Sequence, residues 1–171
     1  NKASNISVVK NPKLFEFKHI ENEFIEFNRE RLLTQMNHNE GPSMAVADLN
    51  NDQIDDVYIG GGKNQKGVLF VSTKKGDYQR QETPFDKDMA SEDTNALFFD
   101  GDQDGDLDLI VASGGKAFSE ISFSLNDRYY INEGNGNFKK QPQGLEFPRN
   151  FSSNAIAVAD INLDGFNDIF I

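Results

Sequence analysis

The stretch DGDQDGDLD occupies residues 100–108 and is followed at once by the apolar run LIV at residues 109–111. Its positions 1, 3, 5 and 9 carry carboxylates: Asp100, Asp102, Asp104 and Asp108. Four negative charges so close together repel one another strongly unless a cation lies between them. Gly105 at position 6 permits a sharp turn, and hard oxygen ligands without His or Cys suit calcium better than zinc. The stretch therefore predicts a calcium-binding loop.

The same pattern occurs twice more in the chain. Residues 48–56 read DLNNDQIDD and lead into VYI, and residues 160–168 read DINLDGFND and lead into IFI. The loops begin at residues 48, 100 and 160, and periods of this size indicate propeller blades or another array of one supersecondary unit. The first loop has Gln53 where the others have Gly, so we expect it to be strained or to bind its ion more weakly.

An EF-hand loop begins with the same spacing of oxygen ligands, but it requires a bidentate Glu at position 12. The three loops carry apolar residues there: Ile59, Val111 and Ile171. Short apolar runs also precede the loops, at residues 44–47, 96–99 and 155–159. Such runs are typical of buried strands. The loops are therefore expected to join strands in an all-β fold.

The residues after each of the first two loops follow one order. A glycine-rich turn comes first, at 60–62 or 113–115, and a strand follows at 68–71 or 129–131. A second turn and an aromatic residue complete the unit. Each repeat is thus predicted to be a blade, a four-stranded antiparallel sheet with the calcium loop between its first two strands. The insertion at 116–126 accounts for the longer second period.

The expected organisation has two parts. Residues 41–171 form the repeat region, with blades that begin near residues 43, 94 and 153, the last one incomplete. Residues 1–40 form an N-terminal segment that packs on the repeats or leads into them. Its apolar residues between 20 and 36 fit a helix imperfectly, and an extended segment fits equally well.

Composition excludes several classes of protein. The 171 residues suffice for one domain with a core, or for a slice of a larger repeat architecture. The formal net charge is −11, which argues against a nucleic-acid partner because phosphate contacts require a basic face. The chain has no Cys for a disulfide or thiolate site, and its apolar runs are too short for a membrane span.

The first residue is Asn1 rather than Met, and the sequence stops on a predicted strand, so we interpret it as a segment of a longer protein. Weak calcium loops work where calcium is near millimolar. We therefore expect an extracellular, cell-surface or periplasmic location.

Three features resemble the FG-GAP/VCBS repeat family, which includes the propellers of integrin α subunits and many large bacterial envelope proteins. They are the loop and strand at 100–111, the SGG at 113–115 and the YYINEGNGNF at 129–138. The resemblance covers about residues 41–171, although a literal Phe-Gly and Gly-Ala-Pro sequence is absent. It implies a β-propeller, commonly of seven blades, of which this chain holds about three. The remaining blades would come from the rest of the chain or from another copy.

The resemblance also implies about three calcium ions, one in each loop between the first two strands of a blade. Side chains at positions 1, 3, 5 and 9 and the carbonyl at position 7 would be the ligands. By this likeness they are Asp48, Asn50, Asp52, Ile54 and Asp56; Asp100, Asp102, Asp104, Asp106 and Asp108; and Asp160, Asn162, Asp164, Phe166 and Asp168.

The sequence lacks a catalytic constellation, and we predict that this segment is not an enzyme. The glycine runs at 60–63 and 114–116 do not match a Walker spacing, and nothing completes a triad with His19 or His38. The expected function is calcium-stabilised binding of a protein or glycan, as in adhesion. The alternative is an accessory or substrate-binding part of a larger carbohydrate-active enzyme, acting through the insertion at 116–126. A purely architectural role is a third interpretation.

Overall fold

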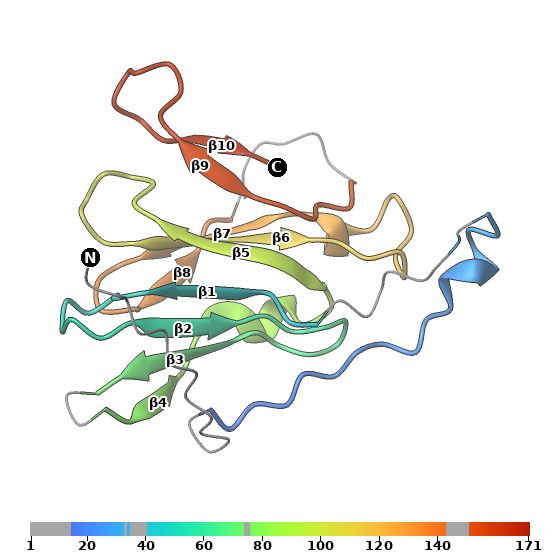
Figure 1. Cartoon of the computed structure of the whole chain (residues 1–171), viewed down its shortest axis with the longest axis horizontal. Helices are drawn as coiled ribbons and strands as arrows, with labels where there is room; N and C mark the ends of the chain where they lie inside the picture. Colours follow the sequence, from blue (N-terminus) through green and yellow to red (C-terminus); the bar gives the residue numbers. More distant parts are fainter. Residues whose placement is uncertain (1–14, 33, 35–40, 74–75, 143–150) are drawn as a thin grey trace, which may run out of the picture.

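The computed structural model describes residues 15–32, 34, 41–73, 76–142 and 151–171. Within these residues the chain forms ten β-strands and three short 3-10 helices, and it contains no α-helix (Figure 1). The expected all-β fold is therefore confirmed. Of the predicted N-terminal segment, residues 1–14, 33 and 35–40 lie outside the described part.

The first blade is a four-stranded antiparallel sheet in the order β1-β2-β3-β4. Its strands are β1 (Met44–Ala47), β2 (Asp56–Ile59), β3 (Val68–Ser72) and β4 (Tyr78–Gln81). Every residue of β2 is buried because the strand is paired on both edges and covered on both faces. The outer strand β4 has the polar sequence YQRQ and is partly exposed throughout.

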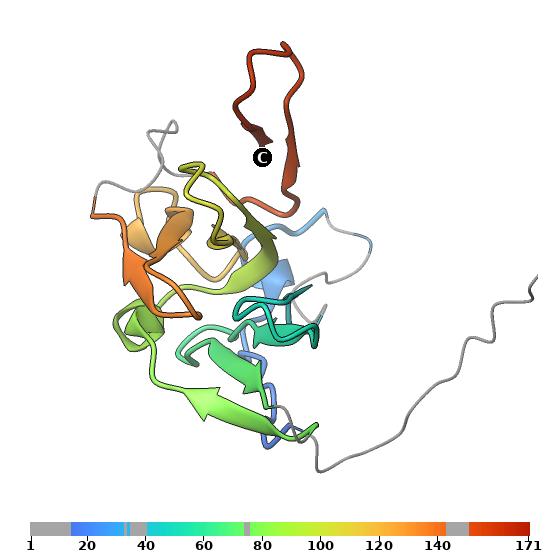
Figure 2. The same cartoon turned by 90° about the vertical axis from the view of Figure 1, so that its left-hand side faces the viewer.

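The second blade repeats this meander in the order β5-β6-β7-β8. Its strands are β5 (Asp93–Phe99), β6 (Asp108–Ser113), β7 (Arg128–Asn132) and β8 (Phe138–Lys140). A third unit consists of the hairpin formed by β9 (Ala157–Ala159) and β10 (Asp168–Phe170), which Figure 2 shows projecting from the two complete blades. The four-stranded propeller-type blades are therefore confirmed, and the described residues do not close into a ring.

The two complete blades pack face to face around one apolar core. From the two sheets, this core buries Tyr58, Leu69, Leu109, Val111 and Tyr130. The 3-10 helix η2 (Pro84–Asp88) links the blades and inserts Phe85 between them, with its ring centroid 5.2 Å from that of Tyr58 and 4.8 Å from that of Tyr130. Complete burial of such a ring contributes about 2–3 kcal/mol.

Successive blades are joined by one repeated hydrogen bond. The Asp93 amide donates to the Gly61 carbonyl at 2.9 Å, and the Ser153 amide donates to the Ser113 carbonyl at 3.0 Å. Gly61 and Ser113 hold equivalent positions, each five residues after the aspartate that begins the second strand of its blade: Gly61 lies just beyond β2, and Ser113 is the last residue of β6. The third unit therefore follows the second blade as the second follows the first, and it packs Ile156, Val158 and Ile169 on that blade's other face.

The N-terminal segment covers the remaining face of the first blade. Phe15 and Phe17 pack on a cluster that includes Val57 and Phe70, with ring centroids of Phe15 and Phe70 5.1 Å apart. Over residues 15–32 and 34 the segment is extended apart from turns and the 3-10 helix η1 (Glu26–Asn28), so the helix that the sequence left open does not form over these residues.

The segment then reaches the insertion of the second blade. Arg29 donates to the carbonyls of Lys116 and Phe118, and Lys116 pairs with Glu30 at 2.9 Å. The insertion itself contains the 3-10 helix η3 (Phe123–Leu125).

Candidate metal centre

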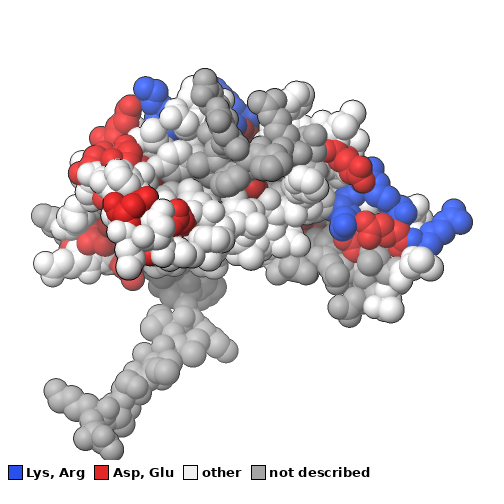
Figure 3. All heavy atoms as spheres, turned by 90° about the horizontal axis from the view of Figure 1, so that it is seen from above, with Lys and Arg blue, Asp and Glu red and all other residues white. Residues whose placement is uncertain are grey.

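The three acidic loops have one geometry. Each joins the first two strands of its unit, and all three lie at the same end of the molecule, on the left of Figure 1. In each loop the position-1 carboxylate accepts from the amide of position 6: Asp48 from Gln53 at 2.8 Å, Asp100 from Gly105 at 3.2 Å, and Asp160 from Gly165 at 2.9 Å. Figure 3 shows acidic side chains gathered at this end.

The carboxylates also shape the loop backbone. Asp52, Asp104 and Asp164 at position 5 each accept from the amide of position 7 at 2.9 Å. Position 6 has a positive φ in every loop, namely 69° at Gln53, 93° at Gly105 and 89° at Gly165. Only glycine adopts this region without cost, so the strain expected at Gln53 is present in the structure.

The second loop brings three carboxylates together. Ligand atoms of Asp100, Asp102 and Asp104 all lie within 4.8 Å of one another. Asp100 Oδ1 is shielded from solvent and has no hydrogen-bond partner. A shielded oxygen without a donor, beside two further carboxylates, fits a hard divalent cation, which would satisfy all three groups.

Asp108 is not part of this cluster, and the position-9 carboxylates are largely engaged with the backbone. Asp108 is fully buried, and its Oδ1 accepts from the Asn132 amide at 2.8 Å while its Oδ2 accepts from the Gly101 amide at 3.2 Å and from the Tyr129 hydroxyl. Asp56 accepts in the same way from the amides of Leu49 at 2.8 Å and Ser72 at 2.6 Å.

These bonds tie the loop to the third strand of the blade. In the third unit, Asp168 accepts from the Ile161 amide at 3.0 Å, the counterpart of the loop bond in the other two. The ligand role implied for position 9 thus stays a prediction. The sequence analysis did not predict that position 9 anchors the loop to the backbone. The sequence feature that could have indicated this role is the Asp found at position 9 of all three loops.

Burial raises the pKa of Asp108, whereas the hydrogen bonds from Tyr129, Asn132 and Gly101 act in the opposite direction. Burial also raises the pKa of Tyr129, and the hydrogen bond to Asp108 raises it further. The Tyr129 hydroxyl donates this hydrogen bond and Asp108 accepts it.

In the first blade, a serine hydroxyl from β3 contacts the acidic loop, whereas the fully described second blade has no such contact. Ser72 Oγ lies 3.2 and 3.1 Å from the two carboxylate oxygens of Asp52 and 3.3 Å from the Ile54 carbonyl. The equivalent residue in the second blade, Asn132, instead donates its side-chain amide to the Leu107 carbonyl at 3.1 Å. The serine competes with an ion for two groups that the sequence assigned as ligands of the first loop.

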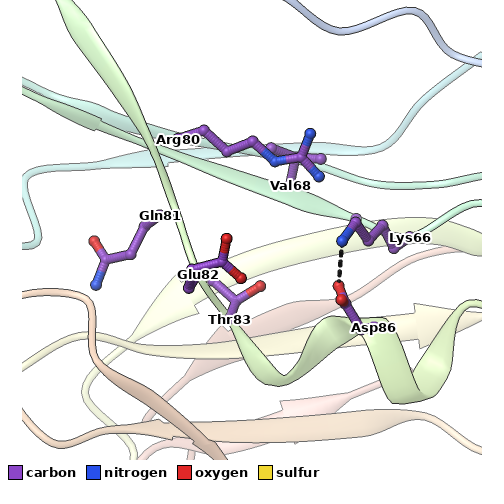
Figure 4. Close-up of a pocket in the computed structure, with 8 residues that line it drawn as sticks. Lys66, Val68, Arg80, Gln81, Glu82, Thr83 and Asp86 are labelled. Atoms are coloured by element: carbon purple, nitrogen blue, oxygen red, sulfur yellow. Dashed lines mark ion pairs between the residues drawn. The ribbon is translucent and has the colours of Figure 1, made fainter.

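Figure 4 shows a hollow of about 330 Å³ in the first blade. Its lining includes Val68, which pairs with Ile59 at the end of β2 that lies away from the acidic loop. Its lining carries both charges, including Arg80 and Glu82, and Lys66 pairs there with Asp86 at 2.7 Å. The described histidine, His19, contacts Glu21 at 2.9 Å.

The stacked four-stranded meanders and their acidic loops define a protein built from propeller-type blades. Residues 100–171 match the family model described as FG-GAP-like repeat, which confirms the resemblance recognised in the sequence. The matched region begins at position 1 of the second loop and includes the third loop. No curated protein matches the chain. In the described part, no helix has the length and hydropathy needed to cross a membrane.

Proposed function

We propose that this chain is a non-catalytic, calcium-binding β-propeller segment of a cell-surface, extracellular or periplasmic protein, and that it binds a protein or glycan partner. The clustering of Asp100, Asp102 and Asp104 is the observation that carries the proposal. The match to FG-GAP-like repeats supports the propeller part. The remaining blades come from the rest of the protein or from another copy.

Charge is the physical reason for an ion. Each pair of carboxylates about 4 Å apart repels by about 1 kcal/mol even at the dielectric constant of water. A divalent cation with oxygen ligands removes this repulsion and occupies the unpartnered Asp100 Oδ1. The second loop, with a carboxylate at each of positions 1, 3, 5 and 9, binds most tightly, and the other two loops take one ion each.

Calcium has a structural role in this proposal. A loop with a dissociation constant of about 0.1–1 mM contributes about 0.4–1.4 kcal/mol at about 1 mM calcium. Loops of this affinity are filled outside the cytoplasm, which is the basis for the proposed location. Three ions make one end of the blades more rigid. The opposite end, which carries the insertion at 116–126, binds the partner.

The metal is tested by calorimetric titration of the chain with calcium. Asp104→Ala removes one bound equivalent, and a chelator lowers the melting temperature until calcium is restored. Asp106→Ala is the matched control because it removes the same charge from the same loop but no predicted side-chain ligand. An unchanged stoichiometry in Asp104→Ala contradicts the assignment.

One observation favours a second candidate function, an accessory or substrate-binding role in a larger carbohydrate-active enzyme. The insertion exposes two large apolar side chains, Ile121 at 79% and Phe123 at 78%. An exposed aromatic ring can stack on a sugar. A glycan array and a hydrolase screen on the full-length protein separate the two functions, since turnover lost in Phe123→Ala supports the second and binding without turnover supports the first.

A further inference from the structure

The second and third acidic loops are hydrogen-bonded to each other. Gln103, at position 4 of the second loop, donates its side-chain amide to the Gly165 carbonyl at 2.6 Å. Asn167, at position 8 of the third loop, donates in return to the Asp100 carbonyl at 2.9 Å. Both acceptors are backbone carbonyls, so only the NH₂ group of each amide can make the contact.

The first and second loops lack this link. The residues equivalent to Gln103 and Asn167 at that junction are Asn51 and Leu107. Leu107 has no side-chain donor, and it packs against the apolar core between the blades. In these two loops, which the structure describes completely, no hydrogen bond joins one loop to the other. The chain thus contains one linked pair of loops and one unlinked neighbour.

The two acceptor carbonyls, of Asp100 and Gly165, belong to loop residues that are predicted calcium ligands or lie next to one. Asp100 is position 1 of the second loop, and its own carboxylate belongs to the three-carboxylate cluster. Gly165 precedes Phe166, whose carbonyl is a predicted ligand, and its amide holds the position-1 carboxylate Asp160 at 2.9 Å. Ordering of either loop around an ion therefore also restrains a backbone group on which the other loop depends.

We infer that Gln103 and Asn167 are positioning residues that couple the second and third loops, so that an ion in one raises the affinity of the other, while the first loop fills independently. The inference rests on the proposed calcium binding. The loop that fills second has already lost part of its conformational freedom, so its binding costs less entropy. By linkage, the coupling is the same in both directions.

Repulsion between the two ions acts against this coupling. It is a Coulomb interaction between exposed charges and is screened over about 8 Å at 0.15 M ionic strength. The hydrogen bonds are local and depend far less on salt. The positive coupling is therefore expected to grow as salt is raised, whereas a purely electrostatic interaction between the sites would be negative and would fade.

The test is a calcium titration of the whole chain by calorimetry at 0.15 M and 0.5 M salt. Asp164→Ala is used to silence the third loop, so that the affinity of the second loop can be compared with its neighbour filled or silenced. Net hydrogen-bond energies of this kind correspond to a coupling of about two- to tenfold in affinity. The double variant Gln103→Ala, Asn167→Ala should reduce this factor to about one.

Asn51→Ala is the matched control because it removes the amide at position 4 of the unlinked first loop, and it should leave the factor unchanged. Melting in chelator separates positioning from plain stability: the double variant should lower the melting temperature more in calcium than in chelator. Equal, independent affinities in the wild-type chain, or a double variant destabilised equally with and without calcium, would overturn the coupling. A chain that takes up no calcium at all would instead overturn the proposed function.

Discussion

Replacing Gln53 by Gly should stabilise the first acidic loop. Gln53 has a φ of 69°, a left-handed conformation that costs a residue with a Cβ about 1–2 kcal/mol. Its side chain is exposed and makes no hydrogen bond, so little is lost with it. Glycine lowers the gain by about 0.5–1 kcal/mol because the unfolded chain becomes more flexible.

The net result is a gain of about 0.5–1 kcal/mol in the free energy of unfolding. For a chain of this size it raises the melting temperature by about 1–4 °C. The measurement is thermal and urea unfolding, monitored by circular dichroism, in chelator and again in calcium. The gain should be present in both, because the strain lies in the backbone rather than in the ion.

The reverse change in the second loop, Gly105→Gln, is the matched control. Gly105 has a φ of 93°, and a Cβ added there meets no atom within 4 Å, so any loss comes from the backbone alone. It should destabilise the chain by about the amount that Gln53→Gly stabilises it. If Gly105→Gln is costly but Gln53→Gly is neutral or destabilising, the left-handed conformation of Gln53 does not destabilise the first loop, and the reasoning is refuted.

Two further predictions concern the buried charges. Burial, followed by the nearby carboxylate of Glu21 and opposed by Lys63, raises the pKa of Glu92 from 4.5 to about 7. The folded state therefore holds the proton more tightly than the unfolded state, and stability falls as the pH rises from about 4.5 through 7. Glu92→Gln should add about 1–2 kcal/mol at pH 8 and almost nothing at pH 4, as measured by urea unfolding; equal effects at both pH values would contradict this reasoning. Arg128 pairs with Asp93 at 2.5 Å with both side chains at most 5% exposed, so Arg128→Met should cost about 3–5 kcal/mol by leaving the carboxylate unpaired. Adding Asp93→Asn should recover part of that loss, and a double variant as unstable as the single one would show that packing rather than charge is responsible.

The local part of the fold and of the site was predictable from the sequence. In every repeat a strand ends directly before position 1 of the acidic loop and the next begins at position 9, as at Phe99 and Asp108 in the second blade. Acidic loop residues, β-branched runs and glycine turns act over a few neighbouring residues, so they can be read along the chain. The spacing of the loops extended this reading to blades because each repeat is one supersecondary unit.

Only the tertiary structure decided how these units use their side chains. In the folded chain, Asp108 accepts a hydrogen bond from the Asn132 amide, Phe15 packs on the free face of the first blade, and Gln103 donates to the third loop. Each of these contacts joins residues that are far apart in the chain. Their partners depend on how the sheets stack and on which face of a strand meets its neighbour, and no local pattern of residues encodes that arrangement.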